Sequence, residues 1–213
     1  MIELEGRDMD VPLSALGERQ ASALGRWFCE QRERPTAIVA SPFARAYHTA
    51  RAIADEMGDT CELVIDERLR EKEFGSLDRL TRAGITAKFP HEAEQRARIG
   101  KFYYRPPGGE SWCDVALRIR SLLEHLATAY RGERVLLVSH QVVVLCARYV
   151  IEHLDEETIL AIDAKGDVVN CGLTSYRGSD DGSVELEAYN FAAPMDETAT
   201  PVTDSPDRTG ARA

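Results

Sequence analysis

The feature that most constrains the fold is a run of four apolar residues, VLLV at positions 135–138. Polar residues, Ser139 and His140, follow it directly, and an apolar helical pattern then extends to about His153. A continuously apolar run of this length is typical of a strand that is buried on both faces, as in parallel sheets. Such a strand needs helices on both sides of its sheet, so the sequence predicts an α/β layered protein.

The rest of the chain alternates strands and helices. Gly17, Ala21, Leu24 and Phe28 recur at helical spacing, and Ser14 is placed to cap the helix that they predict. Turn residues of the segment 178–183 predict a β-hairpin near the end. We expect a three-layer fold with a mainly parallel sheet flanked by helices, with residues 1–192 as one domain and 193–213 as a disordered tail. The expected elements are helices at 13–30, 43–57 (Pro42 at its first position), 112–130 and 141–153, strands at 37–40, 63–65 and 135–138, a hairpin of 171–176 with 184–190, and an irregular segment at 66–110.

Charge and cysteine usage narrow the classes of function. The net charge of −10 makes nucleic acid a poor partner, and no apolar run is long enough to span a bilayer. Five scattered cysteines without a CxxC pair predict neither a disulfide framework nor a metal site, and indicate a cytoplasmic protein. If the ligand is an anion, a few arginines must make a locally positive pocket.

Three polar residues follow three predicted strands, and ligands of open α/β sheets bind beyond the carboxyl ends of the strands. Arg45 is placed to bind two phosphate oxygens, although taken alone it is more simply interpreted as a surface arginine on a helix. His140 could donate to a phosphoryl oxygen or be a satisfied core histidine. Glu71 could act as a general acid or be a solvated glutamate, and Glu73 competes for the same role.

Five motifs in the same order resemble those of the histidine phosphatase (phosphoglycerate mutase-like) superfamily, over residues 10 to about 177. They are DVPLSALGERQA at 10–21, ASPFARAYHTA at 40–50, LREKEFG at 69–75, PGGES at 107–111 and LVSH at 137–140.

The resemblance implies a phosphomonoester phosphatase that acts through a phosphohistidine without a metal or another cofactor, on a small phosphorylated metabolite. Arg45 matches the arginine that holds the phosphoryl group, and His140 matches the second histidine, which stabilises its oxygens. Glu71 matches the acid that protonates the leaving oxygen and then activates water. Catalysis of this kind is positioning plus stabilisation of charge.

The chain departs from the family at the nucleophile. Its histidines are at positions 48, 91, 125, 140 and 153, and none lies in the family's Arg-His-Gly motif. We therefore expect the first strand and the nucleophilic histidine to be missing and this chain to be inactive. A translation start set too late at Met1 would explain this, and in-frame DNA upstream would then encode the motif; a pseudoenzyme that binds phosphate esters is the alternative.

Among branches of the family, the motifs of this chain are most similar to those of the fructose-2,6-bisphosphatase branch. The resemblance implies that Lys101, Tyr104 and Gln141 bind the substrate, but Leu145 stands where that branch carries a substrate-binding arginine. A broader phosphatase is therefore expected, with a phosphoglycerate mutase-type enzyme as the alternative. A cysteine hydrolase using Cys146 and His140 is disfavoured, because six residues along a helix place the pair on different faces. The sequence assigns neither the natural substrate nor the oligomeric state.

Overall fold

The centre of the protein is a parallel sheet of three strands. The computed structural model describes residues 7–58, 61–179 and 182–192. Strand β1 (Ala37–Ala40) lies between β2 (Glu62–Ile65) and β3 (Val135–Val138), and both neighbours run parallel to it. Ala37 pairs with Glu62 on one side and with Val135 on the other. All three predicted strands are confirmed, and their carboxyl ends meet at one edge of the sheet.

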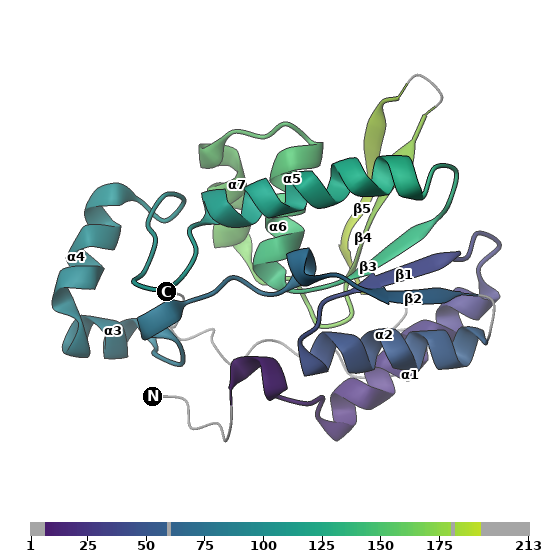
Figure 1. Ribbon diagram of the computed structural model, residues 1–213, viewed down its shortest axis with the longest axis horizontal. Coiled ribbons are helices and arrows are strands. Elements are labelled where there is room, and N and C mark those ends of the chain that lie inside the picture. Colours follow the sequence, from purple (N-terminus) through teal and green to yellow (C-terminus); the bar gives the residue numbers. More distant parts are fainter. Residues whose placement is uncertain (1–6, 59–60, 180–181, 193–213) are drawn as a thin grey trace.

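Helices cover both faces of this sheet (Figure 1). On one face lie α1 (Ala15–Glu30) and α2 (Ala44–Met57); on the other lie α5 (Trp112–Ala129), α6 (Gln141–Ile151) and α7 (Glu156–Lys165). Successive residues of a strand point to opposite faces. Ile38 accordingly packs in the apolar cluster with α1 and α2, whereas Val39 packs in the cluster with α5 and α6. The predicted three-layer α/β fold is confirmed.

Local signals set the ends of the first two helices. Ser14 caps α1 as predicted, because its side chain accepts a hydrogen bond from the amide of Gly17. The prediction that Pro42 is the first residue of the next helix was wrong. Helix α2 begins at Ala44, since Phe43 is extended (φ −65°, ψ 131°) and its amide bonds the hydroxyl of Ser41. Residues 41–43 therefore lie between β1 and α2, so that Ser41 and Phe43 stand beside the end of β1.

The segment predicted to be irregular, 66–110, contains two helices. They are α3 (Arg82–Lys88) and α4 (Pro90–Ile99), which lie apart from the strands, at the left of Figure 1. Thr81 caps α3 through the amide of Gly84, and Pro90 occupies the first position of α4. Both residues are ordinary signals for the start of a helix, but the high charge of the segment led to the prediction of an irregular chain. Short 3₁₀ turns at 67–69 and 75–77 carry the chain from β2 to α3.

The predicted hairpin is confirmed and is separate from the parallel sheet. Strand β4 (Leu173–Gly178) pairs antiparallel with β5 (Val184–Phe191). The tail predicted to be disordered, 193–213, lies outside the described residues. None of the helices among the described residues has the length and hydropathy needed to cross a membrane.

If the first strand is missing, the apolar side chains of 37–40 and 135–138 are expected to border an unfilled slot. This expectation does not hold along the whole sheet. It is wrong for β1, which pairs along both edges and is at most 4% exposed at every residue. Within the described residues, β3 pairs only with β1, and three of its four residues are partly exposed. Leu136 and Leu173 pack against the same apolar cluster, so the start of β4 lies near β3 without a ladder between them.

Candidate functional site

The carboxyl ends of the three strands bring Arg45, Glu71 and His140 together. The ring of Phe43, which follows β1, lies 5.1 Å from the ring of His140, which follows β3, and 5.0 Å from the guanidinium carbon of Arg45. Burial lowers the pKa of His140 and raises that of Glu71, and the charge of Arg45 is a smaller cause that lowers the pKa of both groups. The side chains predicted to converge from separate strands therefore do so.

His140 is a buried histidine at the first turn of α6. It is 9% exposed, and its Nε2 lies 2.8 Å from the hydroxyl oxygen of Ser41. Loss of solvent, and then the charges of Arg45 and Arg118, lower its pKa to about 3. The ring is therefore neutral at neutral pH and keeps one N–H donor and one acceptor nitrogen. Ser41 holds it in place, because the same hydroxyl accepts the amide of Phe43.

Arg45 already holds a carboxylate. Its Nη1 and Nη2 atoms lie 3.2 and 3.1 Å from the two carboxylate oxygens of Asp8, in a 3₁₀ turn at 8–10, and Nη1 also donates to the Asp8 carbonyl. This two-pronged arrangement is the one in which a guanidinium binds a phosphate group. Arg45 is thus oriented to bind an oxyanion, and Asp8 occupies that position here.

Glu71, rather than Glu73, has the environment of a general acid. Burial raises the pKa of Glu71, against the opposing effects of the Lys72 amide, which donates to its Oε1 at 2.8 Å, and of Arg45 and Arg118. Glu73 is exposed and lies 3.9 Å from Arg70. A carboxyl group whose pKa is raised holds its proton nearer to neutral pH, as proton donation to a leaving group requires.

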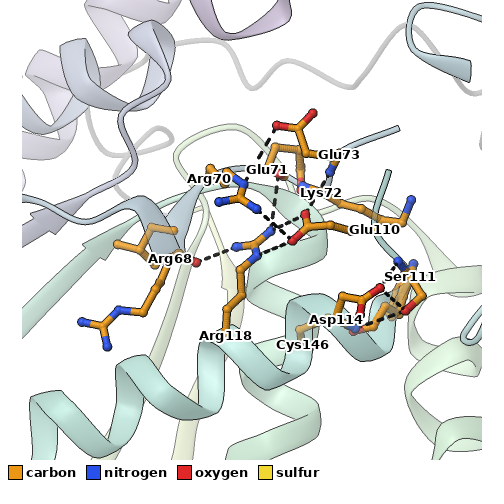
Figure 2. Close-up of polar contacts among 12 residues, drawn as sticks. Arg68, Arg70, Glu71, Lys72, Glu73, Glu110, Ser111, Asp114, Arg118 and Cys146 are labelled. Atoms are coloured by element: carbon orange, nitrogen blue, oxygen red, sulfur yellow. Dashed lines mark hydrogen bonds and ion pairs between the residues drawn. The ribbon is translucent and has the colours of Figure 1, made fainter. Parts of the chain in front are cut away.

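Arg118, from α5, clamps the loop that carries Glu71 (Figure 2). Its guanidinium donates to the carbonyls of Arg68 and Glu71 and forms a two-pronged ion pair with Glu110, at 2.9 and 3.0 Å. The Arg118 side chain is 11% exposed and that of Glu110 is 13% exposed. Sequence reasoning missed Arg118. The signal was its place on the buried face of α5, one turn from Val115 and next to Ile119.

Close backbone contact joins this loop to the segment 107–111. Gly75 has a φ of +55°, and a Cβ atom there would lie 2.2 Å from the carbonyl oxygen of Pro107. The amide of Ser76 donates to that carbonyl, and the amide of Glu110 donates to the carbonyl of Glu73. The glycine is therefore required both by its conformation and by the contact. Two of the five sequence motifs therefore pack directly against each other.

The three residues predicted to bind substrate lie beside this cluster. Lys101 and Tyr104 line a neighbouring pocket, where the Lys101 ammonium is 2.6 Å from Asp163 and the Tyr104 hydroxyl donates to Glu92 at 2.6 Å. Gln141 follows His140 directly and is partly buried in the first turn of α6. Leu145, at the position that departs from the fructose-2,6-bisphosphatase branch, is fully buried in the core.

The cysteine alternative receives no support from the geometry. Cys146 is buried, its sulfur lies 3.7 Å from the carbonyl of Trp112, and burial raises its pKa. His140 instead faces Ser41, so it does not pair with this thiol. All five cysteines are free. Across the described ranges, no group of three or more His, Cys, Asp or Glu side chains is arranged to hold a metal ion.

Comparison with known proteins agrees with the motifs. The sequence model of the histidine phosphatase superfamily (branch 1) matches residues 3–191. The chain belongs to this superfamily. The match covers both the parallel sheet with its strand-end residues and the C-terminal hairpin.

Relatives within the superfamily differ in the activities for which they are named. A protein of Enterobacter sp. named "Probable phosphoglycerate mutase" is 35% identical over 64% of this chain. A 6-phosphofructo-2-kinase/fructose-2,6-bisphosphatase of Caenorhabditis elegans is 33% identical over 64% of this chain. The matched regions span 61% and 28% of those two proteins, respectively.

A solved structure covers more of the chain. The mycobacterial glucosyl-3-phosphoglycerate phosphatase in complex with VO3 is 30% identical, with a TM-score of 0.71, and the match covers 85% of this chain and 88% of that one. This histidine phosphatase therefore has relatives named for phosphoryl transfer and for phosphate-ester hydrolysis, both on small phosphorylated metabolites.

Proposed function

We propose that this histidine phosphatase chain binds phosphomonoesters in the manner of a phosphatase, with Arg45 on the phosphoryl oxygens. Neutral His140 donates a hydrogen bond to the same group, and Glu71 protonates the leaving oxygen. The observation that carries the proposal is the convergence of these three side chains at the carboxyl edge of one sheet. The bound phosphate ester displaces the carboxylate of Asp8 from Arg45.

The reaction of this lineage proceeds through a phosphohistidine, and the chain lacks the motif that supplies it. None of its five histidines lies in Arg-His-Gly. One ring nitrogen of His140, Nε2, lies 2.8 Å from the hydroxyl of Ser41. The resemblance gives this histidine the role of stabilising the phosphoryl oxygens rather than that of the nucleophile. We therefore expect the 213-residue chain to bind phosphate esters without turning them over, because loss of a nucleophile costs on the order of 10⁶ in rate.

For this lineage, hydrolysis of the phosphate ester is favoured over the mutase reaction. The loop LREKEFG lacks the longer signature of the mutases, and the mycobacterial structural relative is named as a phosphatase. The mutase alternative rests on the name of the Enterobacter relative. The third possibility is a pseudoenzyme, in which the natural protein itself binds phosphate esters without catalysis. The five free cysteines without a disulfide framework support a cytoplasmic location.

The test combines turnover with binding. Hydrolysis of p-nitrophenyl phosphate by the purified chain in EDTA is expected to be at background, while calorimetry detects glycerol 3-phosphate binding. Arg45→Ala is expected to abolish that binding, and Arg51→Ala, on the exposed side of α2, is the matched control. Robust turnover that His140→Ala removes would mean that His140 is the nucleophile, and would overturn the assigned roles.

A further inference from the structure

The hydroxyl of Ser41 lies between the end of β1 and the imidazole ring of His140. Ser41 is 0% exposed, so this hydroxyl has no access to solvent. Its oxygen accepts the amide of Phe43 at 3.2 Å and lies 2.8 Å from Nε2 of His140. Within the described ranges of the chain, the hydroxyl has no third hydrogen-bond partner.

The number of hydrogens in this network decides which nitrogen of His140 is protonated. A hydroxyl has one hydrogen to donate and two lone pairs with which to accept. The amide of Phe43 takes one lone pair. If Nε2 carried a hydrogen, it would take the other lone pair, and the buried hydroxyl hydrogen of Ser41 would have no acceptor. Leaving a buried donor unpaired disfavours that arrangement by roughly fivefold to a hundredfold.

The arrangement that satisfies every group has Ser41 donating to an unprotonated Nε2. Because the pKa of His140 is lowered to about 3, the ring is neutral at neutral pH and carries one hydrogen, which is then on Nδ1. Nδ1 has no hydrogen-bond partner among the residues described. Every side-chain nitrogen or oxygen there that is fully shielded from solvent does have a partner, so Nδ1 is within reach of solvent.

The ring is also held in place by an aromatic neighbour. Phe43 meets the imidazole edge to face, with ring centroids 5.1 Å apart, and its other contact is with the guanidinium of Arg45. The residue whose amide occupies one lone pair of Ser41 therefore also contacts both groups of the candidate phosphate site. An N–H donor with no partner in the protein, on a ring fixed next to Arg45, is available to a bound oxyanion.

We propose that Ser41 is a positioning residue that holds His140 in the Nδ1–H tautomer, so that Nδ1 donates to the phosphoryl group. The inference rests on the proposed function for the identity of the ligand, whereas the tautomer belongs to the free protein. It also accounts for the role of His140 as a stabilising group. Nε2 accepts the Ser41 hydroxyl and Nδ1 carries the hydrogen, so the neutral ring has no lone pair left to attack phosphorus.

The tautomer is measurable on the free 213-residue chain labelled with ¹⁵N-histidine. Long-range ¹⁵N–¹H correlation spectra at neutral pH distinguish protonated from unprotonated ring nitrogens. The signals of His140 are those that disappear in His140→Gln, and the other four histidines are exposed. We expect a protonated Nδ1 and an unprotonated Nε2. A protonated Nε2, or shifts averaged between the two tautomers, would overturn the inference.

Variants assign the tautomer to the hydroxyl. Ser41→Ala is expected to give a mixture of tautomers or the Nε2–H form. It should weaken glycerol 3-phosphate binding by roughly threefold to tenfold, because affinity falls with the fraction of rings that present the donor. Ser41→Thr keeps the hydroxyl and is expected to restore both properties.

Ser139→Ala is the matched control. It removes the hydroxyl of the residue before His140, which donates to the carbonyl of Leu69 at 2.7 Å, and it is expected to leave the tautomer unchanged. Circular dichroism and thermal melts check the folding of each variant. Loss of stability in Ser41→Ala with an unchanged tautomer would mean that Ser41 is only structural, and would overturn the inference. The wild-type spectrum decides the tautomer even if Ser41→Thr does not fold.

The two proposals fail separately. An Nε2–H tautomer together with Arg45-dependent binding of glycerol 3-phosphate overturns the role of Ser41 alone. An Nδ1–H tautomer that depends on Ser41, in a chain that binds no phosphate ester, overturns the proposed function alone. On saturation with glycerol 3-phosphate, the Nδ1 resonance is expected to shift and Nε2 to stay unprotonated. Arg45-dependent binding that leaves Nδ1 unshifted would refute Nδ1 as the donor.

Discussion

At the scale of single residues, Arg118 ties the segment 68–71, which is remote in sequence, to helix α5 and to Glu110. Its guanidinium contacts the carbonyls of Arg68 and Glu71 and the carboxylate of Glu110, and both partners of the ion pair are largely buried. Removing one member of a buried pair leaves the other charge without compensation. The loop that carries Glu71 therefore depends on this arginine for its position.

Replacement of Arg118 by methionine is expected to lower the free energy of unfolding by about 3 kcal/mol, because it strands the Glu110 carboxylate. Urea unfolding followed by circular dichroism measures the change. Arg120→Met, at an exposed position of the same helix, is the control and is expected to shift stability by less than about 0.5 kcal/mol. Equal effects of the two substitutions would show that the clamp contributes nothing.

The lowered pKa of His140 makes the stability of the protein depend on pH, and it fixes the direction of that dependence. The folded state holds the ring with a pKa of about 3, against 6.5 for the free side chain, so the unfolded state binds the proton more readily. The stability that this neutral ring confers is complete above pH 6.5 and is lost as the pH falls toward 3.

Between pH 6.5 and 4.5, wild type is expected to lose about 2 kcal/mol more stability than His140→Gln, which cannot titrate at this position. The variant retains Glu71, whose raised pKa acts in the opposite direction, so the difference between the two proteins isolates the histidine. Urea titrations at several pH values measure it. Parallel stability curves for the two proteins would refute a buried neutral His140.

At the scale of elements, the site depends on how two loops meet. Gly75 and Gly132 both have positive φ, of 55° and 81°, but only Gly75 has backbone atoms where a Cβ would be. Gly132→Ala is therefore expected to lower the free energy of unfolding through conformational strain alone, by roughly 1–2 kcal/mol. Gly75→Ala is expected to cost roughly 1–3 kcal/mol beyond that, because the acid loop must move from the carbonyl of Pro107.

Thermal melts of the two alanine variants give this comparison, since the control contains the strain and lacks the crowding. Gly75→Ala is also expected to weaken binding of phosphate esters, because displacement of the loop moves Glu71 relative to Arg45. Melting temperatures that are lowered equally in both variants would mean that the two loops separate without cost.

At the scale of the whole molecule, the described sheet has one enclosed strand, β1, between two edge strands, β2 and β3. Strand β1 pairs on both sides, whereas β3 pairs only with β1 among the residues that the structure describes. Amides on an unpaired edge exchange with solvent more readily than those in a ladder.

Hydrogen exchange is therefore expected to be slow at all four amides of 37–40. At 135–138, about every second amide should exchange much faster, because alternate residues of a strand direct their amides to opposite neighbours. Mass spectrometry or NMR resolves the two segments within one protein, so β1 is an internal control. Uniformly slow exchange along 135–138 would show that the edge of β3 is covered.

The sequence by itself determined the elements and the identity of the strand-end residues. The apolar run 135–138 and the helix cap at Ser14 are local signals. The structure has a strand and a helix start at these positions, as the signals predict. Arg45, Glu71 and His140 could be predicted to converge because parallel strands end at one edge. The sequence also contains start signals for α3 and α4, namely Thr81 and Pro90. The charge of that segment led to the prediction of irregular structure instead.

Tertiary structure alone decided the environment of those residues. The lowered pKa of His140 depends on burial and on Arg118 from α5, and the pairing of Arg45 with Asp8 joins residues 37 positions apart. The same holds for Lys101, whose ammonium lies 2.6 Å from Asp163. Loss of solvent and the distance between charges are properties of the packed chain, and they set the energy of every ionised group. Which residues carry charge was written in the sequence, whereas which charges are buried, paired or left for a ligand was fixed only when the helices closed over the sheet.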